Sequence, residues 1–464
     1  MGEVASAGPG KGGNNARGPA VILLLAAVGA ATHLTLALAG DLRSQPGLLF
    51  GGHGLLLALM LIAWRLLRGN GQLLRWAVGA ALVFRLVAAW GEPALSDDLY
   101  RYLWDGRVQL QGIHPYRYAP ADPELDALRD EHWERINHPE VNTIYPPVAQ
   151  LLFAGLAALR VSPTGLKLFI GLADFGVVLA LGLLLRRLEL PPERLIFYAW
   201  NPLAVLETAG SGHVEPVGVL LVLLTGLWII DRRPGLSTLA LAASVHVKLL
   251  PAMLVPGQLR RLRPRHAALL ALALVLPFLP YAVSGPVIGG GLLDYAQVWE
   301  HNAALYAVTE ELIARVDPTP RLKDGIAFLE RRLGDLPVPW ELLYRQVWPR
   351  ELARLAVAVA ALGWVFWLLR RADLSAPRES FLALGGVLLL SPTLHPWYLL
   401  WVLPFAAAYL SWGWLTLGAT VVLTYASSDG DVGWTMRAFE YLPPLAVALA
   451  CAAGRRRRLL ACAP

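Results

Sequence analysis

Residues Ser96 to Tyr118 read SDDLYRYLWDGRVQLQGIHPYRY and open the first long polar segment of an otherwise hydrophobic chain. The stretch follows a hydrophobic run, so its acidic pair, Asp97 and Asp98, stands where a membrane helix is expected to meet water. A helix from Leu95 to about Gln111 would place four side chains on one face, at positions i, i+3, i+4 and i+7. These are Asp98, Arg101, Tyr102 and Asp105. The pattern predicts a carboxylate, a guanidinium and a phenol that point together away from the membrane.

The acidic pair has a second interpretation as a helix cap. Carboxylates in the first turn of a helix satisfy free amide groups and interact favourably with the helix dipole. Capping does not exclude chemistry, because one carboxylate can cap the helix while its neighbour acts on a substrate. The sequence leaves both roles open for Asp97 and Asp98.

The composition is typical of proteins that cross a membrane many times. Of the 464 residues, 56% are hydrophobic and only 16% are charged, and the mean hydropathy is +0.50. The two cysteines, Cys451 and Cys462, provide neither a disulfide framework nor a cysteine metal site. The net charge of +6 resides largely in short arginine clusters, which suit membrane lipids and topology rather than nucleic acid.

Apolar runs of nearly membrane-spanning length predict an all-α polytopic fold with about 11 to 13 transmembrane helices. Residues 1–18 are interpreted as a disordered cytoplasmic tail, and the run that follows has no cleavage motif and is expected to remain as a helix. The first runs are Ala20–Leu38, Leu48–Leu66 and Leu73–Trp90. Arginines between the second and third run mark the cytoplasm. Residues 91–145 are therefore expected to form a first outer loop.

The segments from residue 146 to 256 are short and interrupted, as in helices that line a protein-enclosed cavity. If each piece crosses the membrane, Arg186 and Arg187 fall outside. If two pieces turn back, these arginines fall inside and the GSGHVE turn at residues 210–215 faces outside, an arrangement that the charges favour. Residues 284–350 are expected to form a second outer loop. The predicted organisation is one transmembrane domain, residues 19–453, followed by a basic cytoplasmic tail, residues 454–464.

Polar groups at the rim of a membrane are costly and therefore suggest function. Asp98 is the leading candidate for a catalytic carboxylate, and Asp97 is the second. Cationic donors suit a phosphate leaving group, because charge develops on its oxygens as the bond breaks. The candidates for substrate binding are Arg101, Tyr102, Arg107, His213, Glu215, His246, Lys248 and His395.

Other polar residues have plainer interpretations. Asp174 lies inside a predicted span and is expected to form a buried hydrogen bond with a neighbouring helix, while His33 and His53 are interpreted as core histidines. The sequence has no Walker loop, no GxGxxG after a strand, no HExxH and no CxxC pair. These absences argue against a nucleotide-binding enzyme of the usual soluble kind.

Five motifs in this order resemble the GT-C superfamily of polytopic glycosyltransferases, most closely the bacterial polyprenyl-phosphate-mannose-dependent mannosyltransferases. They are the stretch quoted above, NTIYPPVAQLLF, ETAGSGHVEP, SVHVKLLP and SPTLHPWYLLWVLP. The resemblance runs from about Leu48 to Tyr441. It adds Tyr145 and Tyr398 as candidates for substrate binding, and it implies the GT-C fold with two long extracytoplasmic loops.

In that family an aspartate at the start of the first outer loop is the catalytic base, and Asp98 matches its position ahead of GIHPY. The adjacent pair differs from the spaced acidic pair of some relatives, so a catalytic or metal role for Asp97 does not follow. The resemblance implies transfer of one sugar, mannose by likeness, from a polyprenyl phosphate to a glycan or glycolipid hydroxyl, with inversion. The protein is then expected in the bacterial inner membrane with an extracytoplasmic active site. No cofactor is required, and a divalent metal is possible without being indicated.

Two alternatives are kept. The first is a transporter or lipid flippase, whose broken helices would hold a substrate site at the midplane of the membrane, although the sequence shows no repeat between its halves. The second is a ligase or polymerase that moves a preassembled lipid-linked oligosaccharide. Only the identity of the substrate separates this second alternative from transfer of a single sugar.

Overall fold

The computed structural model describes residues 17–282, 291, 299–334, 336–427 and 432–461, with no β-strand among them. Six helices within these residues are long and apolar enough to cross a membrane: Gly18–Leu38, Pro46–Leu67, Gly71–Ala88, Pro163–Arg187, Pro264–Ala282 and Pro349–Leu369. Four shorter apolar helices accompany them: Pro147–Ala158, Glu215–Ile230, Pro234–Val247 and Leu250–Leu259. The predicted all-α polytopic class is confirmed. The total of about 11 to 13 spans stays a prediction, as do the domain bounds, and residues 1–16 of the expected tail lie outside the described part.

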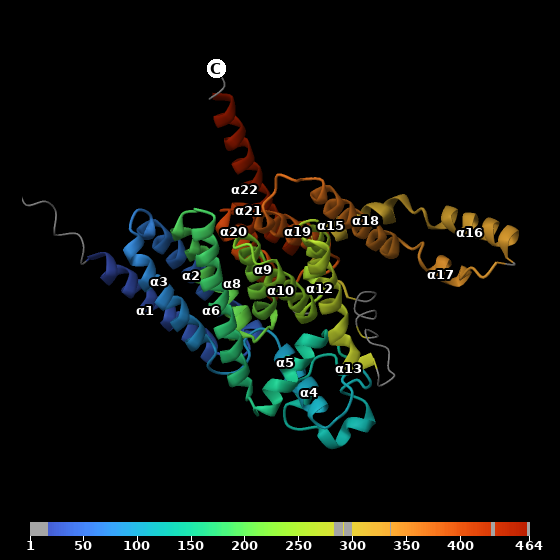
Figure 1. Cartoon of the computed structure of the whole chain (residues 1–464), viewed down its shortest axis with the longest axis horizontal. Coiled ribbons are helices and arrows are strands. Elements are labelled where there is room, and N and C mark those ends of the chain that lie inside the picture. Colours follow the sequence, from blue (N-terminus) through green and yellow to red (C-terminus); the bar gives the residue numbers. More distant parts are fainter. Residues whose placement is uncertain (1–16, 283–290, 292–298, 335, 428–431, 462–464) are drawn as a thin grey trace, which may run out of the picture.

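Three helices at the start of the chain pack side by side (Figure 1). They are α1 (Arg17–Leu38), α2 (Pro46–Leu67) and α3 (Leu74–Ala88). A proline opens α2, where its missing N–H costs nothing. Each helix coincides with one of the predicted apolar runs to within a few residues.

The first outer loop contains α4 (Asp98–Leu110), which packs against α5 (Pro147–Ala158) at one end of the molecule (Figure 1). Gly106 permits this close approach, because a Cβ there would lie 2.2 Å from the backbone oxygen of Phe153. With 12 residues, α5 is shorter than a span. The long helix α6 (Pro163–Arg187) then runs from this end to the opposite one, so Arg186 and Arg187 lie far from the first outer loop.

The interrupted region folds as short helices around a polar turn. It comprises α7 (Ile196–Ala199), α8 (Pro202–Val205), a π-helical turn (Leu206–Gly210), α9 (Glu215–Ile230), α10 (Pro234–Val247) and α11 (Val255–Leu259). His213 in the GSGHVE turn lies 3.8 Å from Asp98, while the far end of α9 is tied to α6 by the 2.8 Å ion pair of Arg187 with Asp231. The turn therefore shares a side with the first outer loop, as in the arrangement that the charges favoured.

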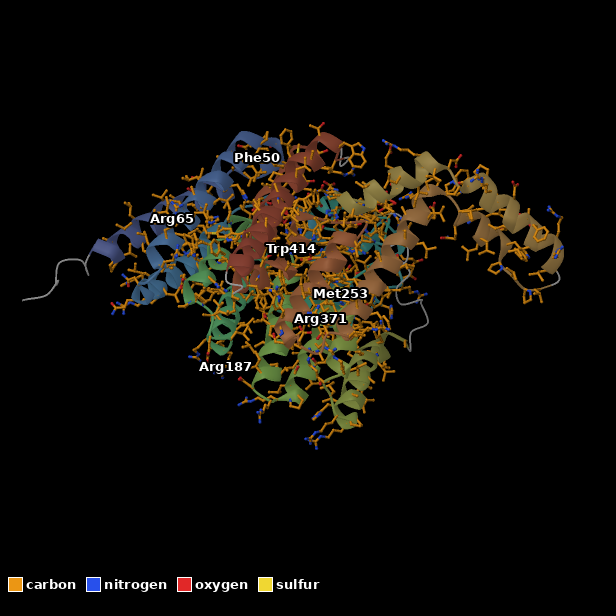
Figure 2. All side chains as sticks on the ribbon, turned by 90° about the horizontal axis from the view of Figure 1, so that it is seen from above. Phe50, Arg65, Arg187, Met253, Arg371 and Trp414 are labelled. Atoms are coloured by element: carbon orange, nitrogen blue, oxygen red, sulfur yellow. The ribbon has the colours of Figure 1, made fainter. Side chains whose placement is uncertain are left out.

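Ten further helices follow in the described part of the chain, most of them packed around this centre. They are α12 (Pro264–Val275), α13 (Leu279–Ala282), α15 (Ala304–Val316), α16 (Thr319–Leu333), α17 (Trp340–Arg345), α18 (Pro349–Leu369), α19 (Ala376–Leu390), α20 (Leu403–Ala408), α21 (Trp412–Thr420) and α22 (Trp434–Ala461). The described part of the second outer loop is mostly helical, and α16 and α17 extend from the body as an arm (Figures 1 and 2). The expected C-terminal tail is helical up to Ala461, since arginine favours helix.

An ion pair deep in the helix bundle joins α3 to α6. Arg85 Nε donates to Asp174 Oδ2 at 2.7 Å, and both side chains are almost completely buried. Arg85 also donates to the backbone oxygens of Ala81 and Ala199 at 2.9 and 3.0 Å, and Tyr198 donates to the second oxygen of Asp174. The expected buried hydrogen bond of Asp174 is thus an ion pair with another helix.

We expect Asp174→Ala to lower the free energy of unfolding by about 3 to 5 kcal/mol, because it leaves the Arg85 guanidinium buried without its carboxylate. The joint change Arg85→Met with Asp174→Leu removes both charges and should cost much less. Chemical unfolding in mixed micelles measures both. Asp373→Ala, which breaks an exposed pair with Arg371, is the matched control and should change little. A loss for Asp174→Ala no larger than for this control would contradict the expectation.

Candidate active site

One cavity of about 150 Å³ gathers polar and aromatic side chains from five parts of the chain. Its walls come from the start of α4, the end of the first outer loop, the end of α10, the second outer loop and the turn that follows α19. The lining residues are Asp98, Arg101, Asn137, His138, Val141, Asn142, Ile144, Tyr145, Lys248, Trp299, His395, Trp397 and Tyr398. Six of the residues singled out in the sequence meet here: Asp98, Arg101, Tyr145, Lys248, His395 and Tyr398.

Asp98 is the first residue of α4 and remains partly exposed to the cavity, with 19% of its side chain accessible. Its Oδ1 accepts a hydrogen bond of 2.6 Å from Asn137 Nδ2, which holds the carboxylate from a later part of the first outer loop. The backbone N–H of Asp98 is taken by Ser96 Oγ at 3.3 Å. The Asp98 carboxylate is therefore oriented toward the cavity and does not cap α4.

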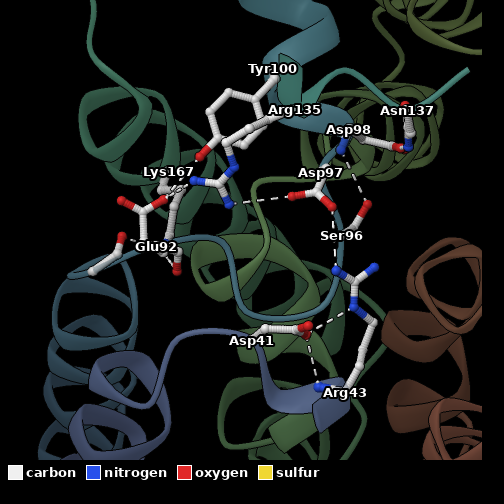
Figure 3. A network of polar contacts seen from close by, with 11 residues as sticks. Asp41, Arg43, Glu92, Ser96, Asp97, Asp98, Tyr100, Arg135, Asn137 and Lys167 are labelled. Atoms are coloured by element: carbon white, nitrogen blue, oxygen red, sulfur yellow. Dashed lines mark hydrogen bonds and ion pairs between the residues drawn. The ribbon is translucent and has the colours of Figure 1, made fainter. Parts of the chain in front are cut away.

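Asp97 belongs to a different set of contacts (Figure 3). It precedes α4 but makes no side-chain cap hydrogen bond. Its two oxygens lie 3.3 Å from Arg43 and 3.5 Å from Arg135. Arg135 also pairs with Glu92 and lowers the pKa of that carboxyl, mainly through the hydrogen bond between them. The adjacent aspartates thus face apart, with Asp98 toward the cavity and Asp97 toward an arginine network.

Lys248 supplies the cation on another wall. It ends α10 in an extended conformation, pairs with the fully buried Glu215, and places its Nζ 4.7 Å from the centre of the Tyr398 ring. Arg101 adds a second cation, whose Nε donates to Asp105 at 2.9 Å. Glu215 does not line the cavity and instead holds the lysine at its edge. Lys248 is therefore anchored within the protein and does not extend toward lipid.

Four stacked rings, which we call the ring column, form the wall between the second outer loop and the GSGHVE turn. The centres of His301 and His395 are 4.3 Å apart, those of His395 and Trp397 are 4.3 Å apart, and those of Trp397 and His213 are 4.1 Å apart. Burial lowers the pKa of His395 well below its usual value, and the nearby His301, Lys248 and His213 lower it further. His395 therefore faces the cavity as a neutral group.

The two outer loops meet across the cavity. The rings of His138 and Trp299 contact edge to face at 4.6 Å. The second loop is in turn fixed to the turn after α19, because His301 forms a parallel β-bridge with Thr393 and accepts a hydrogen bond of 2.8 Å from the Leu394 N–H. The loop residues therefore cover the start of α4, where Asp98 lies.

Four other candidates do not line the cavity, and one of them, His213, lies behind Trp397, with the two ring centres 4.1 Å apart. Tyr102 is buried behind it, stacked on Phe153 at 4.8 Å with its hydroxyl 3.4 Å from that of Tyr145. Arg107 pairs with Asp130 at 2.5 Å in a separate depression. His246 lies 3.1 Å from the backbone oxygen of Leu274. Tyr102 thus supports a lining residue, whereas Arg107 and His246 lie elsewhere, because each finds a partner on a different element.

Several lining residues are not among the candidates from the sequence. Asn137 and His138 lie in an irregular loop without periodicity, and Trp299 is one of 17 tryptophans. Asn142 begins the NTIYPPVAQLLF motif, but that motif pointed to Tyr145 instead. The SPTLHPWYLLWVLP motif contains both His395 and Trp397, but only His395 is a candidate from the sequence. Among the described residues no three histidine, cysteine, aspartate or glutamate side chains are close enough to share a metal ion.

A second, more apolar cavity of about 200 Å³ adjoins the first. The two share Ile144, Tyr145, Lys248 and Tyr398. The rest of the second lining is Pro146, Leu249, Leu250, Leu388, Ser391 and Trp401. The cation of Lys248 therefore stands at the boundary between a polar compartment and an apolar one.

A helical membrane protein with a carboxylate and cations in a polar cavity, next to an apolar one, fits the class of membrane glycosyltransferases. Residues 19–260 match the family described as alpha-(1->6)-mannopyranosyltransferase, N-terminal domain. Residues 143–392 match glycosyltransferase family 87, and residues 350–454 match the MptB C-terminal domain. The chain belongs to the alpha-(1->6)-mannopyranosyltransferase family and is an integral membrane mannosyltransferase. No curated protein and no solved structure matches it significantly.

The turn that carries His213 depends on Gly212, whose φ of +86° lies in the left-handed region. A Cβ there would lie 3.2 Å from Leu99 and 3.4 Å from Lys167. We expect Gly212→Ala to cost about 1 to 2 kcal/mol from the backbone alone and to displace the turn next to Asp98. Gly112→Ala is the matched control, since its φ is +72° but no atom lies within 4 Å.

Unfolding measurements and transfer assays on both glycine variants separate the two effects. Both proteins should be less stable, while only Gly212→Ala should also lose mannosyl transfer at temperatures where it is folded. Equal activity of the two folded variants would show that the turn tolerates a side chain.

Proposed function

We propose that the enzyme moves a single mannosyl residue from a polyprenyl phosphate to a hydroxyl of a glycan or glycolipid acceptor, with inversion at the anomeric carbon. Asp98 is the general base, and the reaction takes place on the extracytoplasmic side of the bacterial inner membrane. The observation that carries this proposal is one cavity whose lining includes both Asp98 and Lys248. The family membership favours this enzyme over a transporter and over an oligosaccharide ligase.

The two adjoining cavities suit the two parts of such a donor. The apolar cavity accommodates the first isoprene units, and the phosphate meets Lys248 at the boundary, with Arg101 and His395 nearby. A cation at this point stabilises the charge that develops on the phosphate as the sugar departs. The mannosyl residue then lies in the polar cavity, where Tyr145 and Tyr398 line its walls.

The chemistry follows from the position of Asp98. Its carboxylate takes the proton of the acceptor hydroxyl while that oxygen forms a bond to the anomeric carbon, and the bond from this carbon to the phosphate oxygen breaks. General-base help contributes typically about 10²- to 10⁴-fold. An inverting reaction that forms the alpha linkage of the family requires a donor with the opposite, beta configuration. No cofactor takes part in these steps.

The sidedness rests on charge. Arginine clusters lie at the ends of α6, α9 and α18, at the opposite end of the molecule from α4. The positive-inside rule assigns the arginine end to the cytoplasm. The cavity then faces outward, where a polyprenyl-linked sugar is available and nucleotide sugars are not.

Asp98→Asn tests the base. The amide keeps the shape and the contact with Asn137 but cannot take a proton, so kcat should fall by about 10²- to 10⁴-fold without loss of the fold. The assay follows release of polyprenyl phosphate from beta- and alpha-linked polyprenyl phosphomannose by purified protein in nanodiscs, with and without EDTA.

Asp97→Asn is the matched control for this assay, because it changes the neighbouring carboxylate outside the cavity. It should retain most of the activity. Normal transfer by Asp98→Asn would remove this residue as the base. Activity with the alpha-linked donor alone would refute inversion, and loss of activity in EDTA would add a metal to the site.

Lys248→Met tests the phosphate contact. We expect the KM for the donor to rise roughly 10- to 100-fold, as for loss of a hydrogen bond to a charged group. The single change also strands the buried Glu215, so the double variant Lys248→Met with Glu215→Gln serves as its partner. The double variant should regain the melting temperature but not the donor affinity. Recovery of both would mean that the lysine only neutralises Glu215.

A further inference from the structure

We propose that His213 and Glu207 form a proton relay behind Asp98. In this relay Asp98 receives the proton of the acceptor hydroxyl and passes it to Nε2 of His213, and the carboxylate of Glu207 stabilises the resulting imidazolium. The inference rests on the proposed role of Asp98. It makes His213 and Glu207 positioning and proton-accepting residues, although neither lines the cavity.

The tautomer of His213 follows from its contacts. Nδ1 lies 2.9 Å from the backbone oxygen of Glu207. A carbonyl oxygen only accepts hydrogen bonds, so the hydrogen of a neutral imidazole resides on Nδ1. The other nitrogen, Nε2, is then the basic one and carries a lone pair.

The basic nitrogen faces Asp98. His213 is completely buried, and its Nε2 has no hydrogen-bond partner in the described part of the chain. Asp98 Oδ2 lies 3.8 Å from it. A buried polar atom without a partner is costly and calls for an explanation. Two proton acceptors that face each other at this distance leave room for one proton, and such contacts tighten when substrates bind.

The two oxygens of Asp98 are not equivalent. Oδ1 is occupied by the hydrogen bond from Asn137, so Oδ2 is the oxygen that can carry a proton toward His213. An imidazole is ordinarily about 400-fold more basic than an aspartate carboxylate. In the relay, transfer of the proton from Asp98 to His213 returns Asp98 to its ionised form.

Glu207 supplies the compensating charge. Its Oε2 lies 3.2 Å from Nδ1 of His213, and its Oε1 accepts a hydrogen bond of 2.7 Å from Tyr425. The Glu207 side chain is completely buried. A buried carboxylate next to an imidazole favours the protonated ring by direct attraction. Tyr425 fixes the carboxylate in the position where this attraction acts.

The proton balance is complete within this set. The O–H bond of the acceptor breaks, the O–H bond of Asp98 forms and breaks, and an N–H bond forms at Nε2. The electron pair of the broken bond to the sugar leaves with the phosphate. After the products depart, the proton returns through Asp98 to water in the cavity.

Other charged groups also face His213 and bear on its titration. Glu215 of α9 lies nearby but is paired with Lys248. His395 lies two rings away in the ring column, and Trp397 covers the face of the His213 ring. The relay therefore has one carboxylate on each side of a completely buried imidazole.

The test compares His213→Gln and Glu207→Gln with the unmodified enzyme. For His213→Gln we expect kcat to fall about 10- to 100-fold with little change in the KM for the donor, less than the loss for a true general base. The double variant with Asp98→Asn should lose no more than Asp98→Asn alone, because residues that act in one step are not additive. His53→Gln removes a buried imidazole of α2 that does not line the cavity and should leave kcat unchanged.

The pH dependence of kcat supplies a second readout. The relay needs neutral His213, so activity falls as the pH drops through the pKa of this residue. Burial lowers the pKa of His213, but the hydrogen bond and charge of Glu207 outweigh it and, with Asp98 and Glu215, raise the pKa above its usual value. Glu207→Gln should therefore move the acid limb to lower pH while it lowers the maximum rate. Unchanged kcat for His213→Gln, multiplicative losses in the double variant, or an acid limb moved upward would each overturn the relay.

If the unmodified enzyme releases no polyprenyl phosphate from any donor, the proposed function fails, and the relay is then tested by nitrogen-15 NMR of labelled histidines. The His213 signals are assigned by their loss in His213→Gln. A hydrogen on Nδ1 and a bare Nε2 at neutral pH support the assignment. A hydrogen on Nε2, or a doubly protonated ring, would overturn it.

Discussion

The cavity depends on the buried ion pair between Glu215 and Lys248. Glu215 begins α9 and Lys248 ends α10, so their contact ties together one end of a helix pair that packs along its length. A completely buried carboxylate costs several kcal/mol in desolvation unless its partner stays in place. Lys248 therefore cannot leave for the lipid surface, and the chain at this point remains extended where α10 would otherwise continue. The need of Glu215 for a charged partner therefore fixes the position of Lys248 at the edge of the cavity.

In the proposed reaction, the protein separates two kinds of charge around this fixed cation. The negative charge of the leaving phosphate would be met by Lys248, at the boundary of the apolar cavity. The proton would move in another direction, toward Asp98 and the groups behind it, His213 and Glu207. Trp397 lies between the cavity and His213 and keeps solvent from the imidazole. In this proposal the phosphate and the proton therefore leave toward different walls of the cavity, and different elements form these walls.

The sequence predicted what depends on local composition. The long apolar runs identified α1, α2 and α18, and the cost of polar groups at a membrane rim directed attention to Asp98, Lys248 and His395. It could not predict pairings between distant segments. Arg43 donates a hydrogen bond to Asp97, which lies 54 residues further along the chain. Arg107 likewise donates to Asp130, which lies 23 residues further along. Nor could it predict α16 and α17, because their charged faces made the segment resemble a polar loop.

The ring column has a mechanical consequence. Its rings lie nearly parallel, with an angle of 3° between His395 and Trp397 and of 20° or less at the other two contacts. Stacked rings lose contact quickly when pulled apart but keep most of it when they slide in their planes. The wall between the second outer loop and the GSGHVE turn is thus stiff in compression and soft in shear. A sideways shift of the loop would therefore cost less ring contact than a separation of the rings along the column.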